Sequence, residues 1–403
     1  MPEPKQIFEE YYDKLLHKAH DDDMSLGLAR SVRAYREGRA KALERFPHTV
    51  ALAEEVKHLK ENCIGRMDEL VQKATASLEE NGAQVHYAKT GDDALKFIGE
   101  IVGSGKILVS GKTLTGEEIE LRHYIEGLGN EYWETDCAQL IQQLRKEKPM
   151  HYVYPSLHIT REQVAEVLFN LLGREIPPDI PTEIRAIREF LRSKYFKADI
   201  GISGCNVLGA DTGTIFLLES EGNIRMSTTV PPVHIAIVGI EKVVPTLHDA
   251  FNVAEVVWRY AGFTIPLYVS MISGPSGTAD IECTLIHGSS GPLELHVIFL
   301  DNGRSTLAKD PILKEALRCI KCGACLFECP VFELAAGYYG GVGYFGGLGA
   351  ILTAYMSGGF DEAAPIAYTC LRCGRCTEVC PQSIDLSKLM PELRHRIVEM
   401  ARR

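Results

Sequence analysis

Two cysteine runs near the C-terminus constrain this chain more than any other feature. Each run reads C-x2-C-x2-C-x3-C-P, and eight of the twelve cysteines lie in them: Cys319, Cys322, Cys325 and Cys329 before Pro330, and Cys370, Cys373, Cys376 and Cys380 before Pro381. This spacing is typical of thiolate-held [4Fe-4S] clusters, in which the fourth cysteine of each run ligates the other cluster. The runs therefore predict two clusters, one held by Cys319, Cys322, Cys325 and Cys380, the other by Cys370, Cys373, Cys376 and Cys329.

Disulfides and structural zinc are the two alternative uses of clustered cysteines. A disulfide scaffold is small, secreted and rich in cysteine throughout. This chain has 403 residues, and its remaining cysteines are scattered singly, at Cys63, Cys137, Cys205 and Cys283. Structural zinc requires one tetrahedral ligand set, not two matching runs that each end in Cys-Pro. Both alternatives are disfavoured, and we expect a domain that transfers single electrons.

The segment between the runs, residues 330–369, is too long for a compact bacterial ferredoxin. Its spacing and helical flanks resemble the helical ferredoxin module of fumarate reductase and heterodisulfide reductase subunits. The segment also contains Gly341-Val342-Gly343-Tyr344-Phe345-Gly346, a match to the dinucleotide fingerprint G-x-G-x-x-G. That fingerprint is meaningful only between a strand and a helix of a βαβ unit, and no strand-like run precedes it. We expect a tight loop over the clusters, and no flavin or nicotinamide bound by this chain.

The composition is that of an ordinary soluble protein with two or three domains. Apolar residues make up 45% of the chain and the net charge is -11. This charge argues against nucleic acid as a partner. We recognise neither a membrane-spanning apolar run nor a secretory signal, and therefore expect a cytoplasmic protein without a transmembrane span. Contact with the inner membrane would be peripheral, through partner subunits.

Hydrophobic periodicity divides the rest of the chain into two parts. Residues 1–79 are predicted to be a helical region, because apolar residues recur at three- and four-residue spacing. In residues 80–304 short strand-like runs alternate with helices, which predicts an open, mostly parallel sheet covered by helices. Residues 151–155 are among the expected strands. Residues 305–403 form the expected two-cluster domain, and we expect the core of the α/β domain to lie before residue 305.

A basic stripe lies in the helical region, where four arginines recur every three residues: Arg30, Arg33, Arg36 and Arg39. A solvated helix face is the favoured interpretation of such a stripe. The alternative is a docking surface for a partner subunit.

Glycine, threonine and proline gather beside buried strands between residues 199 and 234. Such a composition next to strands predicts a ligand crevice, although turns alone explain part of it. The candidate ligand-binding residues are Thr212, Gly213, Thr214, Pro232 and His234.

The same region carries a family resemblance. Several segments resemble the LUD (lactate utilization) domain: Gly111-Lys112-Thr113, Asp211-Thr212-Gly213-Thr214, Glu221-Gly222-Asn223, Pro231-Pro232-Val233-His234 and Leu300-Asp301-Asn302-Gly303-Arg304. Joined to the cysteine-rich module, they resemble the iron-sulfur subunit of the bacterial lactate-utilization complex. The resemblance implies a sheet like that of the sugar-phosphate isomerase and CoA-transferase superfamily. It adds Lys112 to the ligand-binding candidates, and Glu221 joins His234 as a weak catalytic candidate, since a glutamate beside glycine can act as a nucleophile there.

The expected function follows from the number of electrons that lactate oxidation releases and the number that one cluster accepts. Lactate oxidation removes two electrons, whereas one cluster accepts one at a time. We therefore expect an electron-transferring subunit of a complex that oxidises L-lactate, or a similar 2-hydroxy acid, to pyruvate. The expected partners are a cysteine-rich or flavin-bearing dehydrogenase, a second LUD protein or an electron-transfer flavoprotein.

Two alternatives remain open. In the first, the LUD domain is an enzyme that binds an acyl or carboxylate ligand, and the clusters are structural or sensing. In the second, the clusters carry electrons for an electron-transfer flavoprotein or a heterodisulfide-reductase-like complex.

Overall fold

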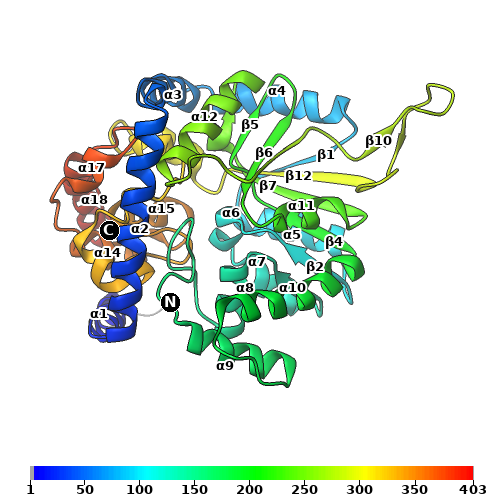
Figure 1. Ribbon diagram of the computed structural model, residues 1–403. Coiled ribbons are helices and arrows are strands. Elements are labelled where there is room, and N and C mark those ends of the chain that lie inside the picture. The colour runs from blue at the N-terminus through cyan, green and yellow to red at the C-terminus, as the bar shows by residue number, and fades with distance from the viewer. Residues whose placement is uncertain (1–3, 403) are drawn as a thin grey trace.

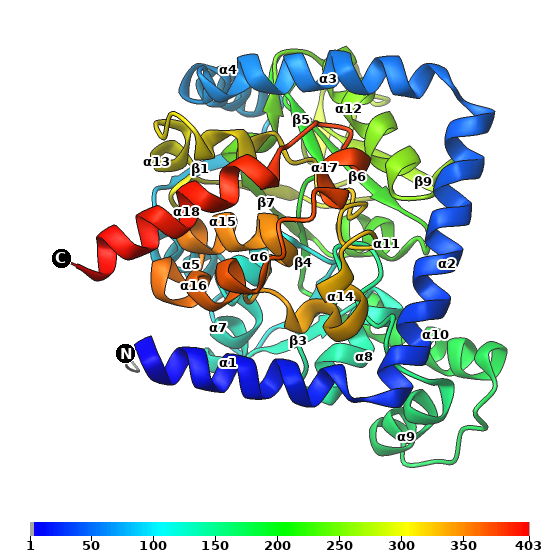
Figure 2. The same ribbon diagram turned by 90° about the vertical axis from the view of Figure 1, so that its left-hand side faces the viewer.

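A computed structural model of the chain describes residues 4–402 (Figure 1). It opens with four helices, α1 (Pro4–Ala19), α2 (Asp22–Arg45), α3 (His48–Ile64) and α4 (Met67–Glu80). The Asp21 carboxylate caps α2 by accepting a hydrogen bond from the Met24 backbone nitrogen at 3.0 Å. These helices confirm the predicted helical region. Figure 2 shows α1, α2 and α3 running around three sides of the C-terminal module.

The arginine stripe of α2 is divided between solvent and the rest of the molecule. Arg30 and Arg33 are exposed. Arg36 and Arg39 instead pair with Glu328, at 3.1 Å each, and Arg36 also pairs with Glu333 at 2.6 Å. Two of the four arginines predicted to lie on a solvated face therefore form an internal contact between α2 and the C-terminal module.

Six parallel strands form the central sheet, in the order β1-β12-β7-β4-β2-β3. Their bounds are β1 (Gln84–Ala88), β2 (Ile107–Ser110), β3 (Glu131–Glu134), β4 (Ile200–Ser203), β7 (Val233–Gly239) and β12 (Glu294–Leu300). Strand β4 is buried throughout and β7 almost throughout, as expected of parallel strands covered by helices on both faces. The predicted open, mostly parallel sheet is confirmed.

The helices of this domain are α5 (Gly91–Val102), α6 (Leu114–Glu118), α7 (Leu121–Gly127), α8 (Cys137–Arg145), α9 (Arg161–Leu172), α10 (Ile180–Lys197), α11 (Asn223–Thr229) and α12 (Leu247–Tyr260), with the short 3-10 helix η1 (Ile240–Lys242). Capping boxes fix several of their starts. At α9, for example, the side chains of Thr160 and Gln163 each accept a hydrogen bond from the other residue's backbone nitrogen.

A second, four-stranded sheet lies beside the first. Its order is β8 (Val243–Val244), β5 (Val207–Gly209), β6 (Thr214–Glu219) and β9 (Tyr268–Ile272). The pairs β5-β6 and β6-β9 are antiparallel. After β9 a hairpin arm formed by β10 (Gly277–Thr278) and β11 (Ile286–His287) extends away from the body of the molecule (Figure 1).

Residues 151–155 do not form the predicted strand. They make turns, because the Nδ1 atom of His151 accepts hydrogen bonds from the backbone nitrogens of Val153 (2.9 Å) and Tyr154 (3.1 Å). The backbone thus folds back onto its own side chain. The strand prediction rested on aromatic and β-branched residue types, which do not reveal such a contact.

The C-terminal module is built from short helices, as predicted. They are α13 (Arg304–Ala308), η2 (Leu313–Arg318), α14 (Pro330–Ala335), η3 (Ala336–Tyr338), α15 (Gly346–Met356), α16 (Gly359–Thr369), α17 (Arg375–Val379) and α18 (Leu386–Ala401). The element before the glycine-rich loop 341–346 is η3, not a strand. The loop therefore lacks the βαβ context of a dinucleotide site.

The apolar core continues from the α/β domain into the C-terminal module. One cluster of buried side chains contains Leu28 of α2, Val238 of β7, Val253 of α12, Phe327 and Leu348. The expectation that the core of the α/β domain lies before residue 305 holds for two other clusters of buried side chains. It does not hold for this cluster, in which the N-terminal helices pack against both parts and join them. No helix within residues 4–402 is both long and apolar enough to cross a membrane.

Candidate iron-sulfur site and adjoining cavity

The C-terminal module gathers the cysteines of the two runs into two groups. One cavity is lined by Cys319, Cys322, Cys325 and Cys380, together with Cys376. A second cavity is lined by Cys329, Cys370, Cys373 and Cys376, together with Cys325. We call the first four residues (319, 322, 325 and 380) the interior cysteine group and the second four (329, 370, 373 and 376) the exposed cysteine group. Each group combines three cysteines of one run with the fourth of the other run.

Matching backbone turns shape the two cysteine loops. The second and fourth residues after the first cysteine of each run have positive φ: Lys321 (59°) and Gly323 (79°), then Arg372 (54°) and Gly374 (81°). Glycine adopts this conformation without steric cost, whereas lysine and arginine seldom do. Pro330 then occupies the first turn of α14, where the missing N–H costs no hydrogen bond. The repeated turns lead each chain segment around one cavity and toward the other.

The two groups suit a polynuclear iron-sulfur cluster better than a single ion. All eight cysteines have free thiols. In the described part of the chain, no three histidine, cysteine or acidic side chains converge on a single metal ion. The thiols instead line a space, as a cluster requires. Burial raises the pKa of Cys329 and Cys380 to about 11, so ligation must displace their protons.

The groups differ in their exposure to solvent. In the interior group Cys322 is buried and the other three thiols are half-buried. In the exposed group Cys373 is exposed, and its neighbours Leu371, Arg372 and Arg375 are exposed as well. The exposed group is therefore the one that a partner protein can approach at the surface.

His151 joins the α/β domain to the interior group. The ring is fully buried, and its Nε2 atom lies 3.2 Å from the Gly323 carbonyl oxygen. Burial lowers its pKa to about 3, so the ring is neutral, with Nε2 as donor and Nδ1 as acceptor. The next side chain, Tyr152, accepts a hydrogen bond from the Phe345 backbone nitrogen at 3.0 Å. Both contacts join segments far apart in the chain, so local sequence patterns do not predict them.

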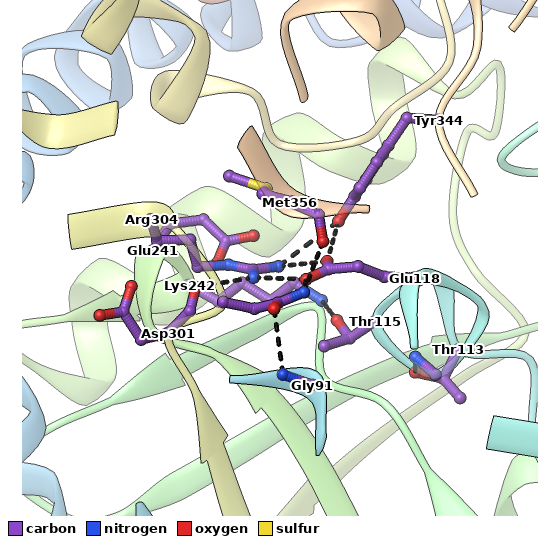
Figure 3. Close-up of polar contacts among 12 residues, drawn as sticks. Gly91, Thr113, Thr115, Glu118, Glu241, Lys242, Asp301, Arg304, Tyr344 and Met356 are labelled. Atoms are coloured by element: carbon purple, nitrogen blue, oxygen red, sulfur yellow. Dashed lines mark hydrogen bonds and ion pairs between the residues drawn. The ribbon is translucent and has the colours of Figure 1, made fainter. Parts of the chain in front are cut away.

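A buried ion-pair network, which we call the seam, also connects the two parts (Figure 3). Arg304 is fully buried and donates to both carboxylate oxygens of Glu118 at 2.8 Å. Its Nε atom donates to Glu241, and the Tyr344 hydroxyl donates to Glu118. Burial raises the pKa of Glu241, but the charges of Arg304, and then of Lys242 and Lys321, outweigh that effect and lower the pKa to about 2. The seam is thus a charged contact between α6, η1, α13 and the loop that carries Tyr344.

A cavity of about 550 Å³ lies between the α/β domain and the interior group. Its charged lining consists of Lys60, Lys112, Lys242 and Lys321 and of Asp136, Glu219 and Glu221, and Cys319 lies in its wall. Apolar lining is supplied by Tyr154, Leu157, Val257, Trp258, Phe263 and Pro266. The cavity therefore brings an organic-molecule-sized space into contact with a predicted cluster ligand.

One predicted ligand residue, Lys112, and one weak catalytic candidate, Glu221, lie on this cavity. Lys112 donates to the Val153 carbonyl oxygen at 3.2 Å. Glu221 accepts a hydrogen bond from the Cys137 backbone nitrogen at 3.0 Å. Burial, and then the charge of Asp136, raises the pKa of Glu221 to about 7. Lys60, Lys242 and Lys321 share the cavity with Lys112. They lie so far apart in the sequence that no local pattern predicts their convergence.

The other predicted ligand residues lie elsewhere. Thr212, Gly213 and Thr214 form the turn into β6, where the Thr214 hydroxyl contacts those of Thr212 (2.7 Å) and Ser273 (2.8 Å). Pro232 precedes β7. His234 is buried within β7, where its Nε2 atom lies 2.8 Å from the Ser203 hydroxyl, and burial lowers its pKa to about 3. None of these residues lines the cavity.

Fold and cysteine loops together define an α/β protein with a C-terminal iron-sulfur dicluster domain. Comparison with known families agrees: the LUD domain matches residues 71–300, and the 4Fe-4S dicluster domain matches residues 315–384. The chain belongs to the LUD domain family.

Several relatives are similar over most of the chain. Lactate utilization protein B 1 of Bacillus mycoides (strain KBAB4) is 37% identical over 355 residues, which are 87% of this chain and 71% of that protein. The uncharacterized electron transport protein YkgF of Escherichia coli (strain K12) is 31% identical over 392 residues, 96% of this chain and 80% of that protein. Lactate utilization protein B of Bacillus pumilus (strain SAFR-032) is 33% identical over 370 residues, 90% and 75% of the two chains.

Proposed function

We propose that this protein is the electron-transferring iron-sulfur subunit of a complex that oxidises L-lactate, or a similar 2-hydroxy acid, to pyruvate. The observation that carries this proposal is the pair of adjoining cysteine groups, one beside an internal cavity and one at the surface. The names of relatives support it, since two are lactate utilization proteins and one is an electron transport protein. When bound, each [4Fe-4S] cluster accepts and releases one electron.

The residues of the chain set the positions of the two sites. Cys319, Cys322, Cys325 and Cys380 would hold one cluster, and Cys329, Cys370, Cys373 and Cys376 the other. Cys325 and Cys376 line both cavities, so the two sites adjoin. Apolar side chains such as Ile320, Leu348 and Ile384 line the interior cavity and exclude water from it.

Partners complete the proposed reaction. A 2-hydroxy acid loses two electrons together, so a cysteine-rich or flavin-bearing dehydrogenase, a second LUD protein or an electron-transfer flavoprotein must handle the pair. Exposed Arg372 and Arg375 beside Cys373 favour a partner with an acidic surface. We place this complex in the cytoplasm, where thiols stay reduced.

Anaerobic purification of the full-length chain with its copurifying partners tests the proposal. We expect about eight irons per chain and the EPR signals of two interacting clusters after chemical reduction. Addition of L-lactate to the isolated complex should produce the same reduced signals, and about one pyruvate should form for every two electrons that the complex takes up. Clusters that form but remain oxidised in the presence of L-lactate would contradict the lactate part of the proposal. A protein that binds no iron after reconstitution would refute all of it.

A second function, an enzymatic LUD domain acting on an acyl or carboxylate ligand, is favoured by one observation. Lys112 and Glu221 line the same cavity. The raised pKa of Glu221, about 7, leaves much of this carboxyl group protonated at neutral pH, which weakens it as a nucleophile. Acyl transfer should be measured on the full-length protein and on Glu221→Gln. Transfer that the substitution abolishes would support this function, and no transfer by the unsubstituted protein would dismiss it.

A further inference from the structure

The cavity beside Cys319 has the size of a small-molecule site. Its volume of about 550 Å³ lies within the usual range of roughly 300 to 1,000 Å³ for such sites. An inorganic ion would leave most of this space empty, and a ligand with no apolar part would leave the apolar lining without a matching contact. The apolar lining residues Tyr154, Trp258 and Phe263 provide a surface on which an organic body can pack.

Positive charge collects at the end of the cavity that contains Cys319. We call Lys60, Lys242 and Lys321 the lysine group. Lys60 donates to the Glu241 carbonyl oxygen, Lys242 donates to the Thr115 hydroxyl at 3.0 Å, and the Lys321 ammonium lies 4.7 Å from the Tyr344 ring centroid. Within residues 4–402 none of the three forms an ion pair with a carboxylate, because Glu241 is engaged by Arg304.

The acidic residues of the cavity do not neutralise the lysine group. Glu219 accepts from the Ile224 backbone nitrogen at 2.7 Å, and Asp136 accepts from that of Gln139 at 3.0 Å. Glu221 accepts from the Cys137 backbone nitrogen. All three carboxylates thus hold backbone amides at the starts of α8 and α11, at the end of the cavity where Lys112 lies.

Partly buried cations without counter-charges are unfavourable in a folded protein. Burial lowers the pKa of both Lys60 and Lys242; the charge of Glu241 raises each without offsetting the effect of burial, and the charge of Lys321 lowers each. An anion placed among the three ammonium groups would relieve this repulsion. Lysine pairs with carboxylate and phosphate groups alike, since its ammonium is a compact point charge.

We propose that the cavity binds an organic anion, with its carboxylate or phosphate group at the lysine group and its body against Tyr154, Trp258 and Phe263. The ligand would then lie against the wall that contains Cys319, next to the interior cysteine group. Binding itself does not depend on the electron-transfer role proposed above. The same acid group could come from a small 2-oxo acid or from a phosphate-bearing aromatic molecule, and the test distinguishes these sources.

The test is calorimetric titration of the full-length, cluster-loaded protein under anaerobic conditions. The probes are pyruvate, flavin mononucleotide and inorganic phosphate. We expect one of the two organic probes to bind at least about tenfold more tightly than inorganic phosphate, because phosphate cannot use the apolar wall. Tight binding of flavin mononucleotide would identify a phosphate-bearing aromatic ligand, and tight binding of pyruvate a small 2-oxo acid.

Two matched variants locate the binding site. Lys242→Met should weaken binding of the organic probe by about tenfold or more, since it removes one buried charge from the lysine group. Lys148→Met is the control, because Lys148 is similarly half-buried but donates to the Gly340 and Gly341 carbonyl oxygens, away from the cavity. The affinity of Lys148→Met for the organic probe should stay within about twofold of that of the unsubstituted protein. Lys242→Gln replaces Lys242→Met if the latter fails to fold.

A measurement without ligand separates binding from a structural role of Lys242. If Lys242 serves the ligand and not the fold, Lys242→Met should not lower the Tm of the ligand-free protein, whereas it should reduce the rise in Tm that the organic probe gives. No binding of either organic probe, binding that Lys242→Met leaves unchanged, or equal binding of inorganic phosphate would each overturn the inference. Iron content and EPR signals of the unsubstituted protein report on the proposed function independently of these titrations.

Discussion

The interior and exposed cysteine groups share one sequence pattern but have opposite surroundings. Both loops have positive φ at the same two positions after the first cysteine. Around the interior group lie a buried histidine, a charged seam and a cavity lined by the lysine group. Buried side chains such as Tyr339 and Phe345 also line the exposed group, whereas Leu371, Arg372 and Arg375 beside it face solvent. The repeat specifies the backbone turns that present the cysteines, whereas the packing around each copy gives the two groups different neighbours.

A cysteine-to-alanine substitution in each group should show the difference between the two groups most clearly. Cys322→Ala should lower the iron content from about eight to about four per chain and also lower the Tm, because Cys322 belongs to the shared core. Cys373→Ala should lose a similar amount of iron with a much smaller change in Tm, since Cys373 is exposed. Metal analysis and thermal unfolding under anaerobic conditions measure both effects. Full iron content in either variant would contradict the ligand assignment, and equal changes in Tm would contradict the difference in surroundings.

The seam is fully buried, whereas the ion pairs of Glu328, the neighbour of Cys329 in the exposed group, keep part of their exposure. Arg304→Met tests the contribution of the seam. The substitution leaves the Glu118 and Glu241 carboxylates buried without their shared cation, which should lower the free energy of unfolding by about 3 to 5 kcal/mol. Arg372→Met is the matched control on the exposed side and should change it by less than about 0.5 kcal/mol. Urea unfolding followed by circular dichroism compares the two. Similar values would mean that the seam does not distinguish the two sides.

Local patterns predicted the parts of this protein that depend on local sequence. The cysteine spacing, the helical N-terminal region and the parallel sheet were all readable because spacing and periodicity report ligation and burial directly. The turn at His151 was missed because its cause is a side-chain acceptor for two backbone amides. The lysine group was missed because Lys60, Lys242 and Lys321 meet only through packing. Predicted crevice residues such as Thr214 and His234 lie apart for the same reason.

Lys148 provides a pH-dependent test on the interior side, where it holds the glycine-rich loop. Burial, and then the charge of Lys14, lowers its pKa from 10.5 to about 7. Between pH 7 and 10.5 the unfolded chain keeps this proton while the folded chain loses it. The free energy of unfolding should therefore rise with pH across this window, by at most about 1.4 kcal/mol per pH unit from this group. In urea unfolding at pH 7, 8 and 9, the free energy of unfolding of Lys148→Met should rise less with pH. Identical pH profiles of the two proteins would show that Lys148 does not cause the rise.

The smallest expected effect concerns the contact between α2 and the C-terminal module. Arg39 pairs with Glu328 at 3.1 Å, and each side chain retains 19% of its exposure. Partly exposed pairs of this kind contribute about 0 to 1 kcal/mol to stability. Arg39→Ala should therefore lower the free energy of unfolding by no more than about 1 kcal/mol, and by less in 1 M salt. Arg33→Ala, on the exposed part of the same stripe, is the control and should leave urea unfolding unchanged. A loss as large as that of Arg304→Met would show that α2, and not the seam, is the main charged contact between the module and the rest of the chain.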